Sequence, residues 1–570
     1  MRSEYSDLAD LLLARAASSS AQTVFTFLGD EEKGEVNWTY AELEQRARVI
    51  AAELQAQDCF GQRVILLYPS GLEFIAAFWG CLLAGAIAVP AYPPRSNRNL
   101  FRLAAIARDC QALAALTTRQ ILERMGAYSA DASLFKAIRL IPTDGLPLHA
   151  AEAWKRPNLS GNSIALLQYT SGSTDVPKGV IVSHANLLHN EALIQGAFRQ
   201  SSESVIVGWL PLYHDMGLIG NVLQPIYCGA RCIMMSPVSF LQSPVRWLNA
   251  ISRYRATTSG GPNFAYDLCT RKVHLSEEEK LDLSSWTVAF NGAEPVRSET
   301  MRRFARRFAN AGFRPEAFAP CYGLAEATLL VSGHVGEPVR TLKVDSKALA
   351  AHDVRRRLKK SKAAHVLTSS GRVAPGVKVR IVNPESGIGC SERQVGEVWL
   401  EGPSVAQGYW GRPEESELVF GARIIRSSQG PFLRTGDLGF LQDGELFVTG
   451  RLKDMIIIRG RNLYPQDIEA SVERAHPGLR AGCGAAFSVE AEGEEKVVIV
   501  QEVERGQENN TATMVDSIRN AVAEQHEIQL FAIFLTRAGS IPKTSSGKIQ
   551  RYACRNLYHS GKLAPLLEWH

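Results

Sequence analysis

Short apolar runs rich in β-branched residues alternate with helix-like stretches over most of the chain, and this alternation constrains the fold more than any other feature. The runs are almost continuously apolar, as in strands that helices cover on both faces. A capping box, Thr39 with Glu42, begins one of the helical stretches. The runs are 63–68, 164–168, 204–210, 231–235 and 287–291. They predict an α/β fold whose large N-terminal domain has mostly parallel sheets flanked by helices.

The pattern changes in the last third of the chain. From about Arg372 to Gly450, short strands with frequent Gly and Pro predict an antiparallel, barrel-like segment that closes the large domain. After Met455, a strand, a helix that begins at Pro465, a strand at 496–502 and a further helix, strand and helix predict a small α+β unit. The expected divisions are residues 1–450, a connection at 451–454, and residues 455–570.

Residues 74–92 carry no charge and, at about 1.5 Å per residue, are just long enough to span a bilayer. Gly80, Gly85 and Pro90 interrupt them. We therefore expect a buried helix followed by a buried strand, and no transmembrane segment. The first twenty residues lack the features of a signal peptide.

The charge balance excludes a protein whose main task is to neutralise many nucleic-acid phosphates. The 570 residues include 63 Lys and Arg against 58 Asp and Glu, a net charge of +5. Residues 353–362 (DVRRRLKKSK) alone carry that excess, with six basic residues and one acidic one. The run is either a solvated helix face or a docking patch for an acidic partner.

Ten cysteines are scattered without CxxC pairs, which indicates reduced thiols and a cytoplasmic protein. Cys228 and Cys232 have the spacing of residues that face one another on a helix. No further Cys/His pair lies nearby to complete a zinc site, so two small core residues are the simpler interpretation.

Residues 170–180 read TSGSTDVPKGV and follow an apolar run. Gly lets backbone N–H groups approach phosphate oxygens, Ser and Thr add hydroxyls, and Lys178 adds a point charge. The spacing of Gly172, Lys178 and Gly179 does not fit a Walker P-loop. The functional interpretation is a phosphate-binding loop, and the alternative without a function is a solvated Ser/Gly linker.

The string YTSGSTDVPKG resembles the phosphate-binding signature of the adenylate-forming ligases, and later strings resemble the other motifs of that family in order. These are YGLAE (322–326), TGDL (435–438), GRLKD (450–454) and PKTSSGK (542–548). The resemblance covers nearly the whole chain. VPAYPP (89–94) and WLPLYHDMGLIG (209–220) resemble most closely its fatty acyl-AMP ligases. Ala325 departs from the broad family, where many members carry Thr.

The resemblance implies a role for each matching residue. Tyr322 would stack on adenine, Asp437 would accept from the ribose hydroxyls, and Glu326 would associate with Mg²⁺. Lys548 would stabilise the charge that develops when a carboxylate attacks the α-phosphorus of ATP, and the carboxylate would lie near His214. The remaining nucleotide-binding candidates are Thr170, Ser171, Gly172, Ser173, Thr174, Lys178, Gly292, Ala293, Gly323 and Arg451.

Each of these residues also has an ordinary structural interpretation. Asp437 by itself would be a surface turn residue, Glu326 a carboxylate at a helix start, and Lys548 a solvated charge. His214 would be a core histidine satisfied by Asp215. The sequence contains no G-x-S-x-G nucleophile elbow, which argues against a serine hydrolase.

The implied activity is formation of an acyl-adenylate and pyrophosphate from a medium- or long-chain fatty acid and ATP with Mg²⁺. The small domain would then swing about Asp454, and the acyl group would pass to the phosphopantetheine thiol of an acyl carrier protein. That partner would be a free holo-protein or a carrier domain of a polyketide or nonribosomal peptide synthase, in lipid or lipopeptide biosynthesis. The alternatives are an acyl-CoA synthetase and a catalytically dead nucleotide-binding regulator.

An insertion at about 335–368 favours the carrier protein. Between Thr328 and Gly371 lie 42 residues, long for a connection, and the stretch resembles the insertion by which fatty acyl-AMP ligases discourage transfer to coenzyme A.

Overall fold

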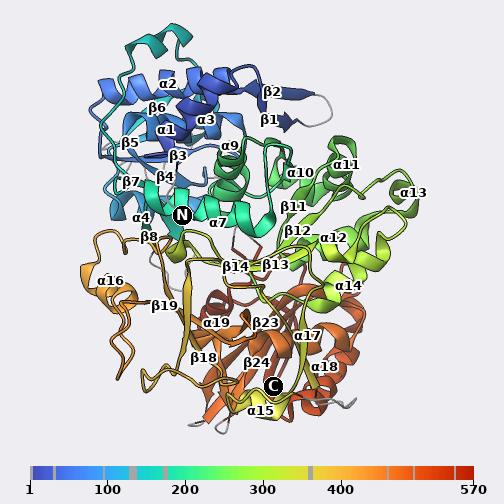
Figure 1. The fold of residues 1–570 in the computed structure, drawn as a ribbon. Helices are drawn as coiled ribbons and strands as arrows, with labels where there is room; N and C mark the ends of the chain where they lie inside the picture. Colours follow the sequence, from blue (N-terminus) through green and yellow to red (C-terminus); the bar gives the residue numbers. More distant parts are fainter. Residues whose placement is uncertain are drawn as a thin grey trace.

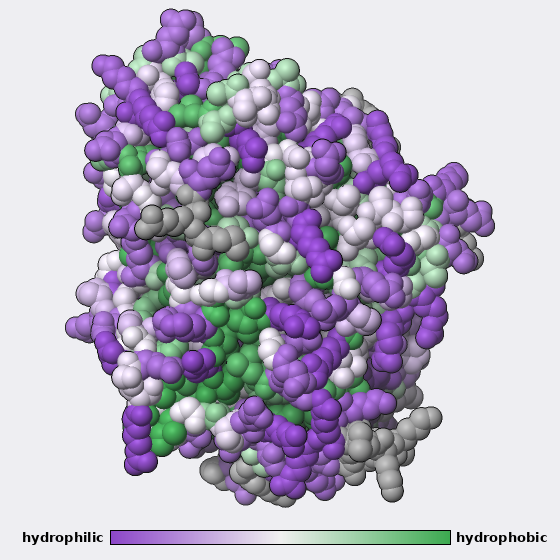
Figure 2. All heavy atoms as spheres, in the orientation of Figure 1, coloured by the Kyte–Doolittle hydropathy of each residue, from purple (hydrophilic) through white to green (hydrophobic). Residues whose placement is uncertain are grey.

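The computed structural model describes residues 4–29, 34–93, 97–126, 138–170, 177–356, 364–458, 461–491, 494–544 and 547–570. Two large sheets with their helices form the N-terminal part, which lies uppermost in Figure 1, and the C-terminal residues form a separate sheet below them. Figure 2 shows hydrophobic atoms gathering below the middle of this face, where Figure 1 draws β18 and β19.

The larger sheet has eight strands. In spatial order they are β14 (Leu330–Gly333), β13 (Phe318–Gly323), β12 (Val288–Asn291), β11 (Thr258–Gly260), β9 (Val205–Gly208), β10 (Arg231–Met235), β1 (Thr23–Leu28) and β2 (Glu35–Thr39). The strands from β13 to β1 are parallel, and β14 and β2 are antiparallel edges. The three predicted runs in this region form β9, β10 and β12.

The second sheet has six strands. In spatial order they are β6 (Arg139–Pro142), β5 (Ala114–Thr117), β3 (Arg63–Leu67), β4 (Ile87–Ala91), β7 (Ile164–Thr170) and β8 (Lys178–Ser183). All neighbours are parallel except β7 and β8. The predicted parallel α/β architecture is confirmed.

Helices cover these sheets. They are α1 (Leu8–Ser18), α2 (Tyr40–Ala56), α3 (Leu72–Ala84), α4 (Asn97–Asp109), α5 (Arg119–Gly126), α7 (His184–Phe198), α8 (Asp215–Leu218), α9 (Gln224–Cys228), α10 (Pro237–Gln242), α11 (Val245–Tyr254), α12 (Asn263–Lys272), α13 (Leu275–Glu278) and α14 (Ser298–Arg307). The capping box that Thr39 and Glu42 predict begins α2.

The uncharged stretch at 74–92 is a buried helix, α3, followed by the buried strand β4, as predicted. Within the described ranges, no helix has both the length and the apolar character that crossing a bilayer requires. Cys228 ends α9 and Cys232 lies in β10. The two therefore do not share a helix, but both are buried, which confirms the interpretation as core residues.

The Gly- and Pro-rich region forms an antiparallel sheet. Its order is β17 (Lys378–Val382), β18 (Gly396–Glu401), β19 (Leu433–Gln442) and β20 (Glu445–Arg451), with α16 (Pro413–Phe420) between β18 and β19. The insertion forms a hairpin of β15 (Thr341–Asp345) and β16 (Ala364–Thr368) around α15 (Ser346–Ala350). The predicted antiparallel pairing is confirmed.

The C-terminal residues form a four-stranded sheet with three helices. The strands are β23 (Leu479–Ala491), β24 (Glu494–Val503), β25 (Leu530–Thr536) and β26 (Pro565–Trp569). The helices are α17 (Pro465–Ala475), α18 (Thr511–His526) and α19 (Arg551–His559). A hairpin of β21 (Ile456–Ile458) and β22 (Arg461–Leu463) precedes them. Two hydrophobic clusters lie within this unit. The sequence patterns did not predict β23 or β26.

Candidate active site

A cavity of about 1860 Å³ lies where the large sheet, the antiparallel sheet and the C-terminal unit meet. Because the carboxyl ends of parallel strands share one edge of a sheet, the segments after β12 and β13 both reach this cavity. The predicted site residues that line it are Lys178, His214, Ala293, Tyr322, Gly323, Glu326, Asp437, Arg451 and Lys548.

Asp437 is a buried carboxylate held from two sides. Its Oδ2 accepts from the Tyr322 hydroxyl at 2.7 Å, and its Oδ1 accepts from Arg451 Nε at 3.0 Å. Thr435 Oγ1 fixes the turn by accepting from the Asp437 N–H at 3.0 Å, and Gly436 takes the positive φ of 69° that the turn requires. Only 5% of Asp437 is exposed, so the interpretation as a surface turn residue is wrong.

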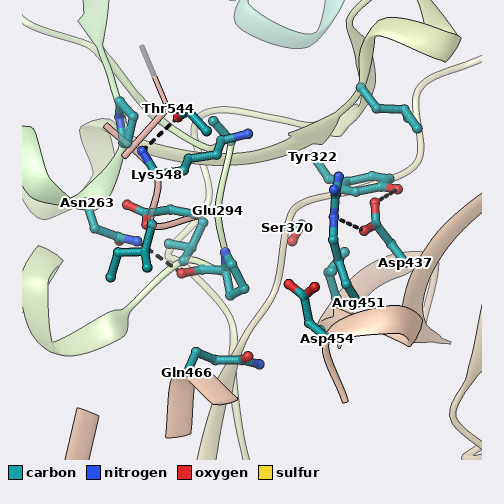
Figure 3. Close-up of a pocket in the computed structure, with 18 of the residues that line it drawn as sticks. Asn263, Glu294, Tyr322, Ser370, Asp437, Arg451, Asp454, Gln466, Thr544 and Lys548 are labelled. Atoms are coloured by element: carbon teal, nitrogen blue, oxygen red, sulfur yellow. Dashed lines mark hydrogen bonds and ion pairs between the residues drawn. The ribbon is translucent and has the colours of Figure 1, made fainter. Parts of the chain in front are cut away.

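Lys548 lies across the cavity from Asp437, beside Glu294 (Figure 3). Its loop is closed by two bonds to Thr544, one from the Lys548 N–H to Oγ1 at 3.0 Å and one from the Thr544 N–H to the Lys548 carbonyl at 2.7 Å. Burial lowers the pKa of the Lys548 ammonium, the charge of Arg451 lowers it further, and Asp215 and Glu294 oppose that shift. Lys548 is therefore not a solvated surface charge.

His214 is the N-cap of α8 and Asp215 is its first residue, and both line the cavity. Burial, with smaller effects from Lys548 and Arg102, lowers the pKa of His214 to about 3, so the imidazole is neutral at physiological pH. Asp215 Oδ1 accepts from the Met216 N–H at 2.7 Å, and burial raises the pKa of the Asp215 carboxyl. A neutral His214 is suited to hydrogen bonding rather than to charge stabilisation.

Glu326 lies in the short helix η4 (Ala325–Ala327), and its Oε1 accepts from the Tyr409 hydroxyl at 2.9 Å. Lys178, the first residue of β8, forms an ion pair with Glu415 and lies 5.4 Å from the centre of the Tyr409 ring. A hard carboxylate oxygen and an ammonium group therefore face the same side of the cavity, where they suit a divalent cation and phosphate oxygens.

The chain after β12 and β13 approaches the cavity closely. A Cβ on Gly323 would collide with the Leu329 carbonyl oxygen, and one on Gly292 would lie 2.7 Å from Cys321 Sγ. Ala293 has a φ of 71°, unusual for a residue with a side chain. Gly292 itself does not line the cavity, although Ala293 does.

The predicted residues Ser171, Gly172, Ser173 and Thr174 lie outside the described residues, and of Thr170 only its place at the end of β7 is described. The prediction missed three groups that act on the site, namely Glu294, Tyr409 and Glu415. Glu294 directly follows Gly292 and Ala293, which were predicted to bind the nucleotide, so its place in the sequence indicated that it lies near the site. Tyr409 and Glu415 contact residues 83 and 237 positions away, and no local pattern indicates such pairings.

Comparisons with known proteins agree with this geometry. A family described as AMP-binding enzyme matches residues 13–410, and one described as Disco-interacting protein 2-like, AMP domain, matches residues 453–566. The medium-chain-fatty-acid–[acyl-carrier-protein] ligase JamA of Moorena producens is 48% identical over 98% of this chain and 96% of its own length. The long-chain-fatty-acid–AMP ligase FadD26 of Mycobacterium marinum is 37% identical over 96% and 97%.

Solved structures are similar over the same extent. The fatty acyl-adenylate ligase of L. pneumophila, in complex with acyl adenylate and pyrophosphate, has a TM-score of 0.77 and 43% identity, covering 99% of this chain and 98% of that one.

Proposed function

The chain belongs to the AMP-binding enzyme family, within its fatty acyl-AMP ligases, and we propose that it joins a fatty acid to AMP and then transfers the acyl group to an acyl carrier protein. In the first step a carboxylate oxygen bonds to the α-phosphorus of ATP and pyrophosphate leaves. In the second, the phosphopantetheine thiol attacks the acyl carbon, loses its proton, and releases AMP.

One observation carries this proposal: a single cavity holds Lys548 on one side and Asp437, with Tyr322 and Arg451, on the other. Asp437 offers a fixed pair of carboxylate oxygens to vicinal hydroxyls, and Tyr322 offers an aromatic face beside them. Lys548, from the C-terminal unit, would face the charge that develops at phosphorus.

Each chain segment has a distinct task in the proposed first step. Lys548 would stabilise the equatorial phosphate oxygens, where a half-buried ammonium acts more strongly than one in water. His214, neutral and half-buried, would orient the attacking carboxylate by a hydrogen bond. Lys178 would exchange Glu415 for the outer phosphates.

Glu326 would hold Mg²⁺ through a hard oxygen, and a magnesium ion there would neutralise phosphate charge. The Tyr409 hydroxyl already orients this carboxylate.

We further propose that residues 1–450 and 455–570 act as two domains about a hinge at 451–454. The separate hydrophobic clusters of the C-terminal unit and the two family matches, which end and begin at 410 and 453, support this division. The ten cysteines are free, which supports a cytoplasmic location.

The acceptor decides between two related activities. JamA is named for transfer to an acyl carrier protein, which supports the same acceptor here, either a free protein or a carrier domain of a polyketide or nonribosomal peptide synthase. An acyl-CoA synthetase would share the first step and differ only in the thiol.

The test is to incubate the full chain with ATP, Mg²⁺ and a fatty acid, alone, with holo-carrier protein, or with coenzyme A. We expect acyl-adenylate and pyrophosphate in every mixture, carrier loading in the second, and little acyl-CoA in the third. If no fatty acid supports pyrophosphate exchange, the chain would instead be a nucleotide-binding regulator. Acyl-CoA formation as fast as carrier loading would make it an acyl-CoA synthetase.

A further inference from the structure

One part of the cavity, here called the branch, is lined by residues on a single face of the eight-stranded sheet. Thr258 pairs with Val288 and Gly260 pairs with Phe290, so Thr258 and Phe290 point to the same face. Gly260 lets Phe290 pack closely against β11, because a Cβ there would lie 2.2 Å from the Phe290 carbonyl oxygen and 2.6 Å from Cγ of its ring. Thr258, Phe290 and Cys321 of β13 all line the cavity.

The C-terminal end of α7 forms the opposite wall. Ile194 and Phe198 line the branch, and the Phe198 ring stacks on Phe290 with centroids 6.3 Å apart and an angle of 13° between the planes. Leu329 and Leu330 complete the wall. The branch is therefore a buried apolar slot, suited to a hydrocarbon chain.

Two buried polar side chains, Gln200 and Thr258, also line the branch and are 7% and 3% exposed. They lie 3.4 Å apart, and the Gln200 amide is 2.7 Å from the amide of Gln224. The Gln224 amide nitrogen donates to the Gln200 amide oxygen, and the Gln200 amide nitrogen donates to the Thr258 hydroxyl. Because this relay fixes Gln200 from behind, its side chain cannot turn aside without leaving buried polar groups unpaired.

One end of the slot lies beside the catalytic loop. Gly547, which precedes Lys548, packs on the Phe264 ring, where a Cβ would come within 2.9 Å, and Phe264 and Pro262 line the cavity after β11. Thr258 and Pro262 are four residues apart, in β11 and the two residues after it, so at about 3.3 Å per residue they lie at most about 13 Å apart. Methylene groups advance by about 1.3 Å each along an extended chain, so this depth fits about ten carbons.

We propose that Gln200 and Thr258 form the floor of the acyl-chain slot and limit the substrate to fatty acids of medium length. The inference rests on the proposed function and names its substrate class. Gln200 is a specificity-determining residue in this assignment: it touches the end of the chain, far from the reacting carboxylate.

The experiment measures kcat/KM for pyrophosphate release with saturated fatty acids from about six to about sixteen carbons. The wild type should prefer about eight to ten carbons and lose activity steeply beyond twelve. Gln200→Ala removes the floor and should move the optimum to acids about two carbons longer. Gly220→Leu should move it to shorter acids, because Gly220 lines the cavity and a Cβ there meets no atom within 4 Å.

The control is Gln195→Ala, which removes an amide from α7, five residues before Gln200, at a position that does not line the cavity, and should keep the wild-type profile. Gly220→Leu keeps the proposal testable if Gln200→Ala does not fold. An unchanged optimum in the folded variants, or equal use of sixteen-carbon acids by the wild type, would overturn the floor while adenylation itself continued. Absence of adenylation with every acid would instead count against the proposed function.

Discussion

Lys548 is the residue on which the proposed first step depends most. Its side chain is half-buried in the cavity, where this burial and the charge of Arg451 lower the pKa of the ammonium and Asp215 and Glu294 oppose that shift. We predict that Lys548→Ala lowers the rate of acyl-adenylate formation by about 10²- to 10³-fold, the usual effect of removing a preorganised charge. Pyrophosphate exchange measures this step alone.

The same variant should still transfer the acyl group when acyl-adenylate is supplied, because no charge develops on a leaving pyrophosphate in the second step. Lys562→Ala is the matched control, since Lys562 is an exposed lysine of the same unit. Wild-type exchange in Lys548→Ala would remove Lys548 from the mechanism. The lowered pKa also predicts that exchange declines, as pH rises, below the pH at which an ordinary lysine loses its proton.

A buried histidine outside the cavity makes stability depend on pH. His184 Nδ1 accepts from the Leu8 N–H at 3.1 Å, and burial lowers the pKa of His184 from 6.5 to about 4. Because the unfolded chain binds this proton first, the free energy of unfolding should be highest above pH 6.5 and fall between pH 6.5 and 4. At about 1.4 kcal/mol per pKa unit the loss reaches about 3 kcal/mol.

Denaturant unfolding of His184→Asn at several pH values checks this prediction. Asn keeps a hydrogen-bond acceptor but does not titrate, so the slope of stability against pH should become smaller. Some slope should remain, because the pKa of half-buried His214 is lowered in the same direction. His149→Asn, at an exposed position, should behave as the wild type; an equally steep slope in His184→Asn would contradict the assignment.

At the scale of elements, the connection between the two units is the short helix η5 (Leu452–Asp454). Asp454 accepts from Arg551 at 3.2 Å, and Arg551 also binds the buried Glu469 through two bonds of 2.7 Å. Asp454→Pro fixes φ near −65° and restricts Lys453, so it should impair transfer to the carrier thiol several-fold more than adenylation.

Asp454→Asn separates the two effects of that substitution, since it weakens the ion pair with Arg551 but leaves the backbone free. We expect it to retain most of the transfer activity. Single-turnover measurements of each half-reaction decide the matter. Equal loss of both half-reactions in a folded Asp454→Pro enzyme would argue against a hinge.

The insertion contacts the C-terminal unit directly. Asn462 Nδ2 donates to the Ala350 carbonyl at 3.0 Å, and Lys347 pairs with Glu527 at 2.9 Å. If these contacts restrain the C-terminal unit, Lys347→Ala with Asn462→Ala should raise the rate of acyl-CoA formation a few-fold. Lys343→Ala, in the same hairpin but exposed, is the control. An unchanged ratio of coenzyme A to carrier transfer would count against the restraint.

Point substitutions test this better than deletion of residues 339–364. The hairpin buries Leu342, Val344 and Leu349 against Phe440 and Tyr464. Its removal would expose that cluster and confuse loss of packing with loss of restraint.

The elements that could be predicted share one physical property, a pattern confined to neighbouring residues. Runs such as 231–235 indicated strands because four of the five residues are consecutive and apolar. By contrast, β23 begins LRAGCGAA, and Gly and Ala have low strand propensity, so its pairing with β24 decides its structure. The site followed the same division: Asp437 and Lys548 belong to recognisable strings, whereas Tyr409 and Glu415 act through pairings between distant parts of the chain.

At the scale of the whole molecule, positive and negative charges are nearly balanced. Any electrostatic attraction of a carrier protein would therefore come from a local patch of charge. The basic run at 353–362 carries the net excess. Residues 357–362 lie outside the described residues, but Arg355 and Arg356 are described, and both are exposed. Asp353 and Arg356 form β-bridges with Gln394 and Val344, so the described part of the run is not the helix face that the sequence suggested. A docking patch and a solvated surface predict different rates of carrier loading.

We predict that Arg355→Glu with Arg356→Glu slows carrier loading by up to about tenfold at low ionic strength, because an acidic carrier would lose its electrostatic attraction. The difference should shrink as salt rises, since exposed charges are screened beyond about 10 Å at 0.1 M. Adenylation should not change. Arg423→Glu with Arg426→Glu alters the same charge at other exposed positions and should load carrier as the wild type does. Equal loading rates for both double variants, across the salt range, would identify the run as a solvated surface.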